Sequence, residues 1–103
     1  MKVLSAGPAA RADRPATEIL HDESSARIVA FHLQRGQKVK PHRSDSTVFV
    51  QVVSGGGWFA GENAREYLTA GVGAVYAPGE LHSIDATETP LRFLAIITPR
   101  PGG

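Results

Sequence analysis

Residues 36–55 have the sequence GQKVKPHRSDSTVFVQVVSG, and the second half of this stretch decides the fold class. Successive side chains of a β-strand point to opposite faces, so Val48, Val50 and Val52 share one face while Gln51 lies on the other. Valine is also a residue that fits a pleated, half-buried surface. The stretch therefore predicts a β-strand whose valine face lines the interior of a barrel.

Short apolar runs rich in Val, Ile and Phe recur along the rest of the chain, separated by glycine-containing turns. Turns at about every ten residues are typical of an all-β sandwich or barrel. Few windows keep a helical period, so we expect little helix. Glycines supply positive φ at turns, and residues 54–57, SGGG, are expected to form a hairpin turn. The predicted strands include residues 26–33, 47–53, 58–60, 74–77 and 91–98.

The composition excludes several kinds of partner and site. Eleven Lys and Arg balance ten Asp and Glu, which gives a net charge of +1, so we expect neither nucleic-acid nor membrane binding. The absence of cysteine excludes disulfides and thiolate ligands. No apolar stretch has the length of a signal peptide or a membrane span, so we expect one cytoplasmic domain from the 103 residues.

Five residues of the opening stretch keep a spacing that is known from one protein family. The stretch resembles the first motif of the cupins, in which a Gly, five residues, His-x-His, three or four residues, Glu, six residues and Gly follow one another. Two of the three ligand positions of this motif are changed, since Ser and Val replace the second His and the Glu. The residues in register are Gly36, His42, Ser44, Val48 and Gly55.

A second segment resembles the other cupin motif, Gly, five residues, Pro-x-Gly, two residues, His, three residues and Asn. Here Gly71, Ala77, Gly79, His82 and Ala86 fall in register, with alanines in place of the Pro and the Asn. The chain is thus identified as similar to small single-domain cupins of the type 2, conserved-barrel group. This resemblance implies a double-stranded β-helix, which is an antiparallel jelly-roll barrel of six to ten strands.

The resemblance also implies a degraded metal centre in the barrel. An intact motif holds a metal ion with three His and one Glu, whereas this chain retains His42 and His82 and carries Ser44 and Val48 at the other positions. Neither serine nor valine is a usual ligand for first-row metals. The expected cofactor is therefore none, or a divalent ion (Zn, Ni, Fe or Mn) held by His42 and His82. A third ligand would have to come from Asp45, which has the wrong strand parity, or from Glu80, which lies in a loop.

Three functional hypotheses remain open at this point. In the leading one, the barrel binds a small molecule through His42, His82 and Ser44, with Val48, Val50 and aromatic side chains forming an apolar wall. The alternative is a metal-dependent enzyme of oxygenase, isomerase or decarboxylase type, whose catalytic residues the sequence does not identify. In the third, the barrel serves assembly alone.

The chain is expected to divide into an N-terminal arm and a barrel. Residues 7–15 are rich in Ala, Pro and Arg without an apolar period, so residues 1–20 are assigned to an arm that packs on a partner subunit, and residues 21–103 to the cupin barrel. Small cupins that this chain resembles pair through an edge strand and such an arm. We therefore expect a homodimer, because pairing covers an open sheet edge.

Overall fold

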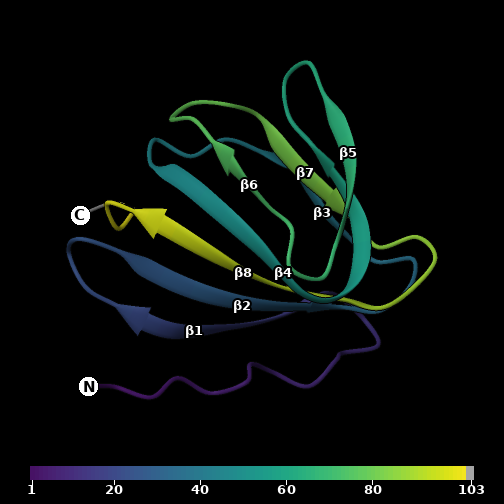
Figure 1. Ribbon diagram of the computed structural model, residues 1–103, viewed down its shortest axis with the longest axis horizontal. Helices are drawn as coiled ribbons and strands as arrows, with labels where there is room; N and C mark the ends of the chain where they lie inside the picture. The colour runs from purple at the N-terminus through teal and green to yellow at the C-terminus, as the bar shows by residue number, and fades with distance from the viewer. Residues whose placement is uncertain (102–103) are drawn as a thin grey trace.

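The computed structural model describes residues 1–101, and these form eight antiparallel strands joined by turns (Figure 1). The all-β prediction with little helix is confirmed, and within the described residues no helix could cross a membrane. The strands are β1 (Ala16–Asp22), β2 (Arg27–Leu33), β3 (Lys38–His42), β4 (Thr47–Ala60), β5 (Arg65–Thr69), β6 (Gly73–Tyr76), β7 (His82–Asp85) and β8 (Leu91–Thr98).

The strands follow the order β1-β2-β8-β4-β7-β3, with β5 and β6 also paired to β4. Figure 1 shows two facing layers, one with β1, β2 and β8 and one with β3, β5 and β7, and β4 curls from the first into the second. The first part of β4 pairs with β8 and β6, and its last part pairs with β5 and β7. One long strand thus closes the sheet into a barrel.

The expected hairpin turn at residues 54–57 is wrong, because β4 continues through this glycine-rich segment. The pairing of β4 with β8 shifts register between Val52 and Ser54, and Gly55 has a φ of 72°. A Cβ atom at Gly55 would overlap the carbonyl oxygen of Pro90. The glycines therefore allow β4 to bulge and bend while neighbouring backbone passes close by, which increases the curl of the sheet.

The predicted valine face of β4 is confirmed as part of the core. Val48, Val50 and Val52 are only 5%, 2% and 1% exposed, whereas Gln51 is half-buried on the other face. The core continues into side chains from β2, β5, β6, β7 and β8. Its further members include Leu33, Phe59, Leu68, Tyr76, Ile84, Leu91, Phe93 and Ala95.

Residues 1–15 precede β1 as irregular backbone that runs along the same chain's barrel (Figure 1). Arg92 donates a hydrogen bond to the carbonyl of Ala6 over 2.6 Å, and His32 Nδ1 lies 3.1 Å from the carbonyl of Pro8. Gln37 likewise donates to the carbonyl of Arg11 over 2.7 Å. These contacts fasten the segment to β2, to β8 and to the turn between β2 and β3 of its own subunit.

Candidate functional site

The interior of the barrel holds an open cavity of about 610 Å³, within the range of roughly 300–1,000 Å³ that is typical of small-molecule sites. Side chains of β2, β3, β4, β7 and β8 form its wall. Residues 43–46 and 99–101 contribute further lining side chains. The lining residues on which the site depends are Phe31, Val39, His42, Ser44, Asp45, Val48, Val50, His82, Ile84, Phe93, Ala95 and Ile97.

His42 and His82, predicted from the resemblance to form one site, lie side by side in the cavity wall. They are direct cross-strand partners on β3 and β7, so their side chains share one face of the sheet. Their ring centroids are 4.0 Å apart and the ring planes cross at 68°. His82 is 5% exposed, whereas His42 is exposed. The pair therefore joins the buried interior to the mouth of the cavity.

Each of the two rings uses the same nitrogen to contact its own backbone. Nδ1 of His42 lies 2.9 Å from the carbonyl oxygen of Lys40, and Nδ1 of His82 lies 3.2 Å from that of Glu80. A carbonyl oxygen can only accept a hydrogen bond, so these contacts assign the proton of each neutral ring to Nδ1. Nε2 of each ring is then left with an accepting lone pair.

The surroundings of His82 favour its neutral form. Burial lowers the pKa of His82 below its usual range, and the neighbouring His42 lowers it further, while the backbone contact with Glu80 acts in the opposite direction. The ring of Tyr76 lies 4.7 Å from that of His82. Burial also raises the pKa of Tyr76 to about 12, and its hydroxyl donates to the carbonyl of Ala60 over 3.1 Å. Both groups are therefore uncharged near pH 7.

The wall away from the histidines is apolar. Val48 and Val50 line this wall, together with the aromatic side chains of Phe31 and Phe93. The rings of Phe31 and Phe93 are stacked with centroids 4.6 Å apart and an interplanar angle of 5°. The cavity is thus lined by apolar side chains on one side and by imidazoles on the other.

Ser44 and Asp45 lie in the turn between β3 and β4 and line the mouth of the cavity. The parity argument against Asp45 does not apply, because β3 ends at His42 and Asp45 is not in a strand. Ser44 Oγ accepts a hydrogen bond from the backbone nitrogen of Ser46 over 3.1 Å, and Ser46 Oγ donates to the carbonyl of Pro99 over 2.6 Å. Ser44 therefore shapes the turn as well as lining the cavity.

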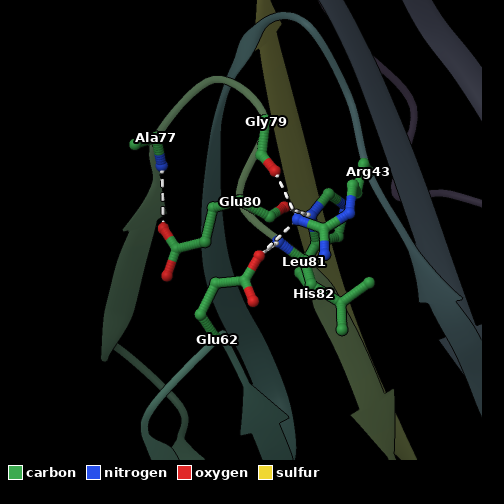
Figure 2. A network of polar contacts seen from close by, with 7 residues as sticks. All are labelled: Arg43, Glu62, Ala77, Gly79, Glu80, Leu81 and His82. Atoms are coloured by element: carbon green, nitrogen blue, oxygen red, sulfur yellow. Dashed lines mark hydrogen bonds and ion pairs between the residues drawn. The ribbon is translucent and has the colours of Figure 1, made fainter.

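A network of polar contacts surrounds Arg43 at the rim of the barrel (Figure 2). Arg43 forms an ion pair with Glu62 and donates to the carbonyl of Gly79 over 2.7 Å. Glu62 also accepts from the backbone nitrogen of Leu81 over 3.0 Å, and this bond and Arg43 lower the pKa of the Glu62 carboxyl. No pattern in the sequence indicates this network, since its members are far apart along the chain.

The Glu80 side chain points away from this network and accepts a hydrogen bond from the backbone of its own turn. Its carboxylate accepts a hydrogen bond from the backbone nitrogen of Ala77 over 3.0 Å (Figure 2). This contact ties the side chain to the loop between β6 and β7. Glu80 is therefore held in a structural role and is not turned toward His82 as a third ligand.

The residues present do not fit the metal centre of an intact cupin motif. The four equivalent positions supply two imidazoles, the hydroxyl of Ser44 and the isopropyl group of Val48. Among residues 1–101, no three His, Cys, Asp or Glu side chains are grouped so that they could hold a metal ion. Asp45 lines the cavity without joining the histidine pair in such a group. The family's usual four-ligand chemistry is not available to this donor set.

Residues 27–102 match the family model of the AraC-like ligand-binding domain. The chain belongs to this family. Its barrel is also similar to an RmlC-like cupin protein from Desulfovibrio desulfuricans, with a TM-score of 0.86, 25% identity and coverage of 96% of this chain and 97% of that one.

A second solved structure of the same kind is an RmlC-like cupin family protein with a double-stranded β-helix fold from Methanocaldococcus jannaschii. It has a TM-score of 0.82 and 20% identity, and the match covers 98% of this chain and 93% of that one. No functionally curated protein matches the sequence. The predicted cupin fold of this AraC-like ligand-binding domain is confirmed.

Proposed function

We propose that this AraC-like domain binds a small molecule in its barrel, through His42 and His82 and without a metal ion. The observation that carries the proposal is the pairing of two imidazoles in an otherwise apolar cavity of about 610 Å³. Small-molecule sites combine an apolar wall with a few polar groups that orient the ligand, and this cavity has that composition. The ligand-binding family supports the same function.

The polar and apolar parts of the cavity have separate roles in this proposal. Stacked Phe31 and Phe93, with Val48 and Val50, bury the apolar body of the ligand, which is favourable by roughly 25 cal/mol per Å² of buried apolar surface. The histidine pair supplies hydrogen bonds that fix the orientation of the ligand. Ser44 is placed to contribute at the mouth.

The proposal is tested by fluorescence titration with the neutral probe N-phenyl-1-naphthylamine, which is strongly fluorescent only in apolar surroundings. The protein is treated with a chelator beforehand. The variant Val39→Trp fills the cavity from a half-buried position on β3, and Val53→Trp adds the same bulk to an outer side chain of β4 that is 53% exposed. We expect saturable binding to the wild type and to Val53→Trp, and a loss of at least about tenfold in Val39→Trp.

Equal binding by both tryptophan variants would show that the probe sits outside the barrel and would contradict the proposal. A titration signal that appears only after a divalent metal is added would also contradict it. Circular dichroism of both variants checks that the loss in Val39→Trp does not come from unfolding.

We also propose that the domain is a homodimer. In residues 1–101, β1 and β3 end the main strand order and β6 pairs only with β4, so several sheet edges are open. Val72, just before β6, and Val75, within β6, are 44% and 63% exposed. Pairing of such an edge with a second copy would satisfy its unpaired backbone groups and cover exposed apolar side chains. Analytical ultracentrifugation of the full chain tests the assembly, and a monomer at all concentrations would contradict it.

A further inference from the structure

The hydrogen-bonding pattern of the two histidines identifies the chemistry of the ligand, and this inference rests on the proposed function of the cavity. Both Nδ1 atoms face backbone carbonyls, those of Lys40 and Glu80, which can only accept. In its neutral form each ring therefore presents one accepting Nε2 atom, so the pair presents two. A ligand that satisfies both must bring hydrogen-bond donors.

An anionic ligand does not match this pattern. A carboxylate or phosphate would place its lone pairs against those of Nε2 in the two neutral rings, which is unfavourable in a largely apolar cavity. The guanidinium groups at the cavity already have acidic partners, since Arg43 pairs with Glu62 and Arg100 lies 3.7 Å from Asp22. Within residues 1–101, the cavity lining therefore offers an anion no guanidinium group without an acidic partner.

The distance between the rings limits how far apart the donors can be. The centroids are 4.0 Å apart, and the two side chains come from directly opposed positions of β3 and β7. Two donors on adjacent atoms of one ligand can approach such a pair together. The rest of the ligand then faces the stacked rings of Phe31 and Phe93 and the valines of β4.

We propose that the ligand is an uncharged, largely apolar molecule with two neighbouring hydroxyl groups, such as an aromatic ortho-diol, which donate to Nε2 of His42 and His82. Burial of both accepting nitrogens without donors would leave them unsatisfied, and this penalty discriminates against molecules of the same shape that lack the hydroxyls. Selectivity for the diol therefore depends on the hydrogen bonds that its two hydroxyl groups donate to the rings.

The test uses three naphthalenes of similar size with chelator present throughout: 2,3-dihydroxynaphthalene, 2,3-dimethoxynaphthalene and 2-naphthoate. Calorimetric titration is expected to show the diol binding about thirtyfold more tightly than the dimethoxy compound, the ratio for two hydrogen bonds of about 1 kcal/mol each. The naphthoate is expected to bind more weakly than the diol. Long-range ¹H–¹⁵N spectra of the free protein are expected to show the Nδ1–H tautomer for both rings.

Three variants test whether the preference for the diol depends on the imidazole rings of His42 and His82. His42→Ala removes an exposed acceptor and His82→Leu a buried one, while His21→Ala changes a histidine of β1 that does not line the cavity. The diol preference should fall to about fivefold or less in each of the first two variants, which retain one acceptor, and stay unchanged in the third. His42→Ala keeps the test valid if His82→Leu fails to fold.

Several outcomes would overturn the inference and leave the proposed function intact. These are equal affinity for the diol and the dimethoxy compound, tightest binding of the naphthoate, or a diol preference that survives in His42→Ala and His82→Leu. Failure of all three naphthalenes to bind while N-phenyl-1-naphthylamine still enters would also overturn it. If the neutral probe is excluded as well, the proposed function itself is wrong.

Discussion

The rim of the barrel and its interior differ in how their polar side chains are satisfied. At the rim, Glu62 accepts from Arg43 and Leu81, and Glu80 accepts from Ala77, so both carboxylates are held by the protein itself (Figure 2). In the interior, His42 and His82 each use one ring nitrogen for a backbone contact. The rim is thus organised for structure, and the interior retains hydrogen-bonding capacity for a ligand.

This difference also explains why carboxylates near the histidines do not rebuild a metal centre. A carboxylate that is fixed by backbone donors in a turn cannot move inward without leaving those donors unpaired. Position 48, from which the resembled motif would supply an anion, is occupied by a buried valine. The cavity therefore keeps its imidazoles in surroundings that favour a neutral ligand.

The largest expected effect concerns the apolar wall of the interior. Phe93 is 2% exposed and packs against Phe31 and Phe59, so Phe93→Ala should lower the free energy of unfolding by ~3–5 kcal/mol. The outer variant Val53→Ala, at a side chain that is 53% exposed, should stay within ~0.5 kcal/mol of the wild type. Urea denaturation followed by fluorescence measures both. Similar losses for the two variants would contradict the assignment of Phe93 to the core.

The second prediction concerns the missing metal ligands of the interior, which two substitutions can restore. The double variant Ser44→His with Val48→Glu supplies the two donors that the resembled motif has at these positions, beside His42 and His82 in one cavity. We expect Zn²⁺ or Ni²⁺ to bind about a hundredfold more tightly than to the wild type, which corresponds to ~2.7 kcal/mol. Calorimetry on folded protein measures the affinity. A wild type that already binds as tightly as the variant would contradict the metal-free account.

Acid should destabilise the interior through His82. Its pKa lies below the ordinary value of 6.5, so between these two pKa values the unfolded chain binds a proton that the folded chain does not. The free energy of unfolding therefore falls as the pH is lowered through this window and levels off below it. Neighbouring groups are His42 on β3, Tyr76 on β6 and Glu80 in the adjoining loop.

We expect the melting temperature of the wild type to fall by a few degrees between pH 7 and pH 5. The decrease should be smaller in His82→Leu, which isolates this ring from the other histidines. Differential scanning calorimetry of both proteins measures the difference. An identical decrease in the two proteins would assign the acid sensitivity to other groups.

The smallest expected effect concerns the rim. Glu62→Gln weakens the ion pair with Arg43 but keeps an acceptor for the backbone of Leu81, so the affinity for N-phenyl-1-naphthylamine should change by less than about twofold. Glu88→Gln, at an exposed glutamate between β7 and β8 that does not line the cavity, serves as the matched control. A large loss of probe binding in Glu62→Gln alone would mean that the rim network forms part of the binding site.

The parts of the fold that were predicted from sequence are those set by local periodicity. The alternation of Val48, Val50 and Val52 identified the buried face of β4, and the spacing of the two motifs placed His42 and His82 in one site. The course of β4 through residues 54–57 was mispredicted, because three glycines favour a turn just as they favour a bulge. Only the close passage of Pro90, distant in sequence, decides between them.

The parts of the site that were missed depend on register between distant strands. Phe31 and Phe93 stack because β2 pairs with β8 in a particular alignment, in which these two residues are opposed. The contacts of Arg43 likewise join three separate loops at the rim. Neither feature leaves a pattern within one segment of the sequence, so both appear only once the sheet is closed.

The most direct test of the central claim is the position of a bound molecule in metal-free protein. The chelator-treated protein is mixed with N-phenyl-1-naphthylamine, and intermolecular NOEs to valine and isoleucine methyl groups are recorded. The account predicts NOEs to the cavity methyls of Val48, Val50, Ile84 and Ile97. NOEs confined to the outer valines Val53, Val72 and Val75, or NOEs that require an added metal ion, would contradict it.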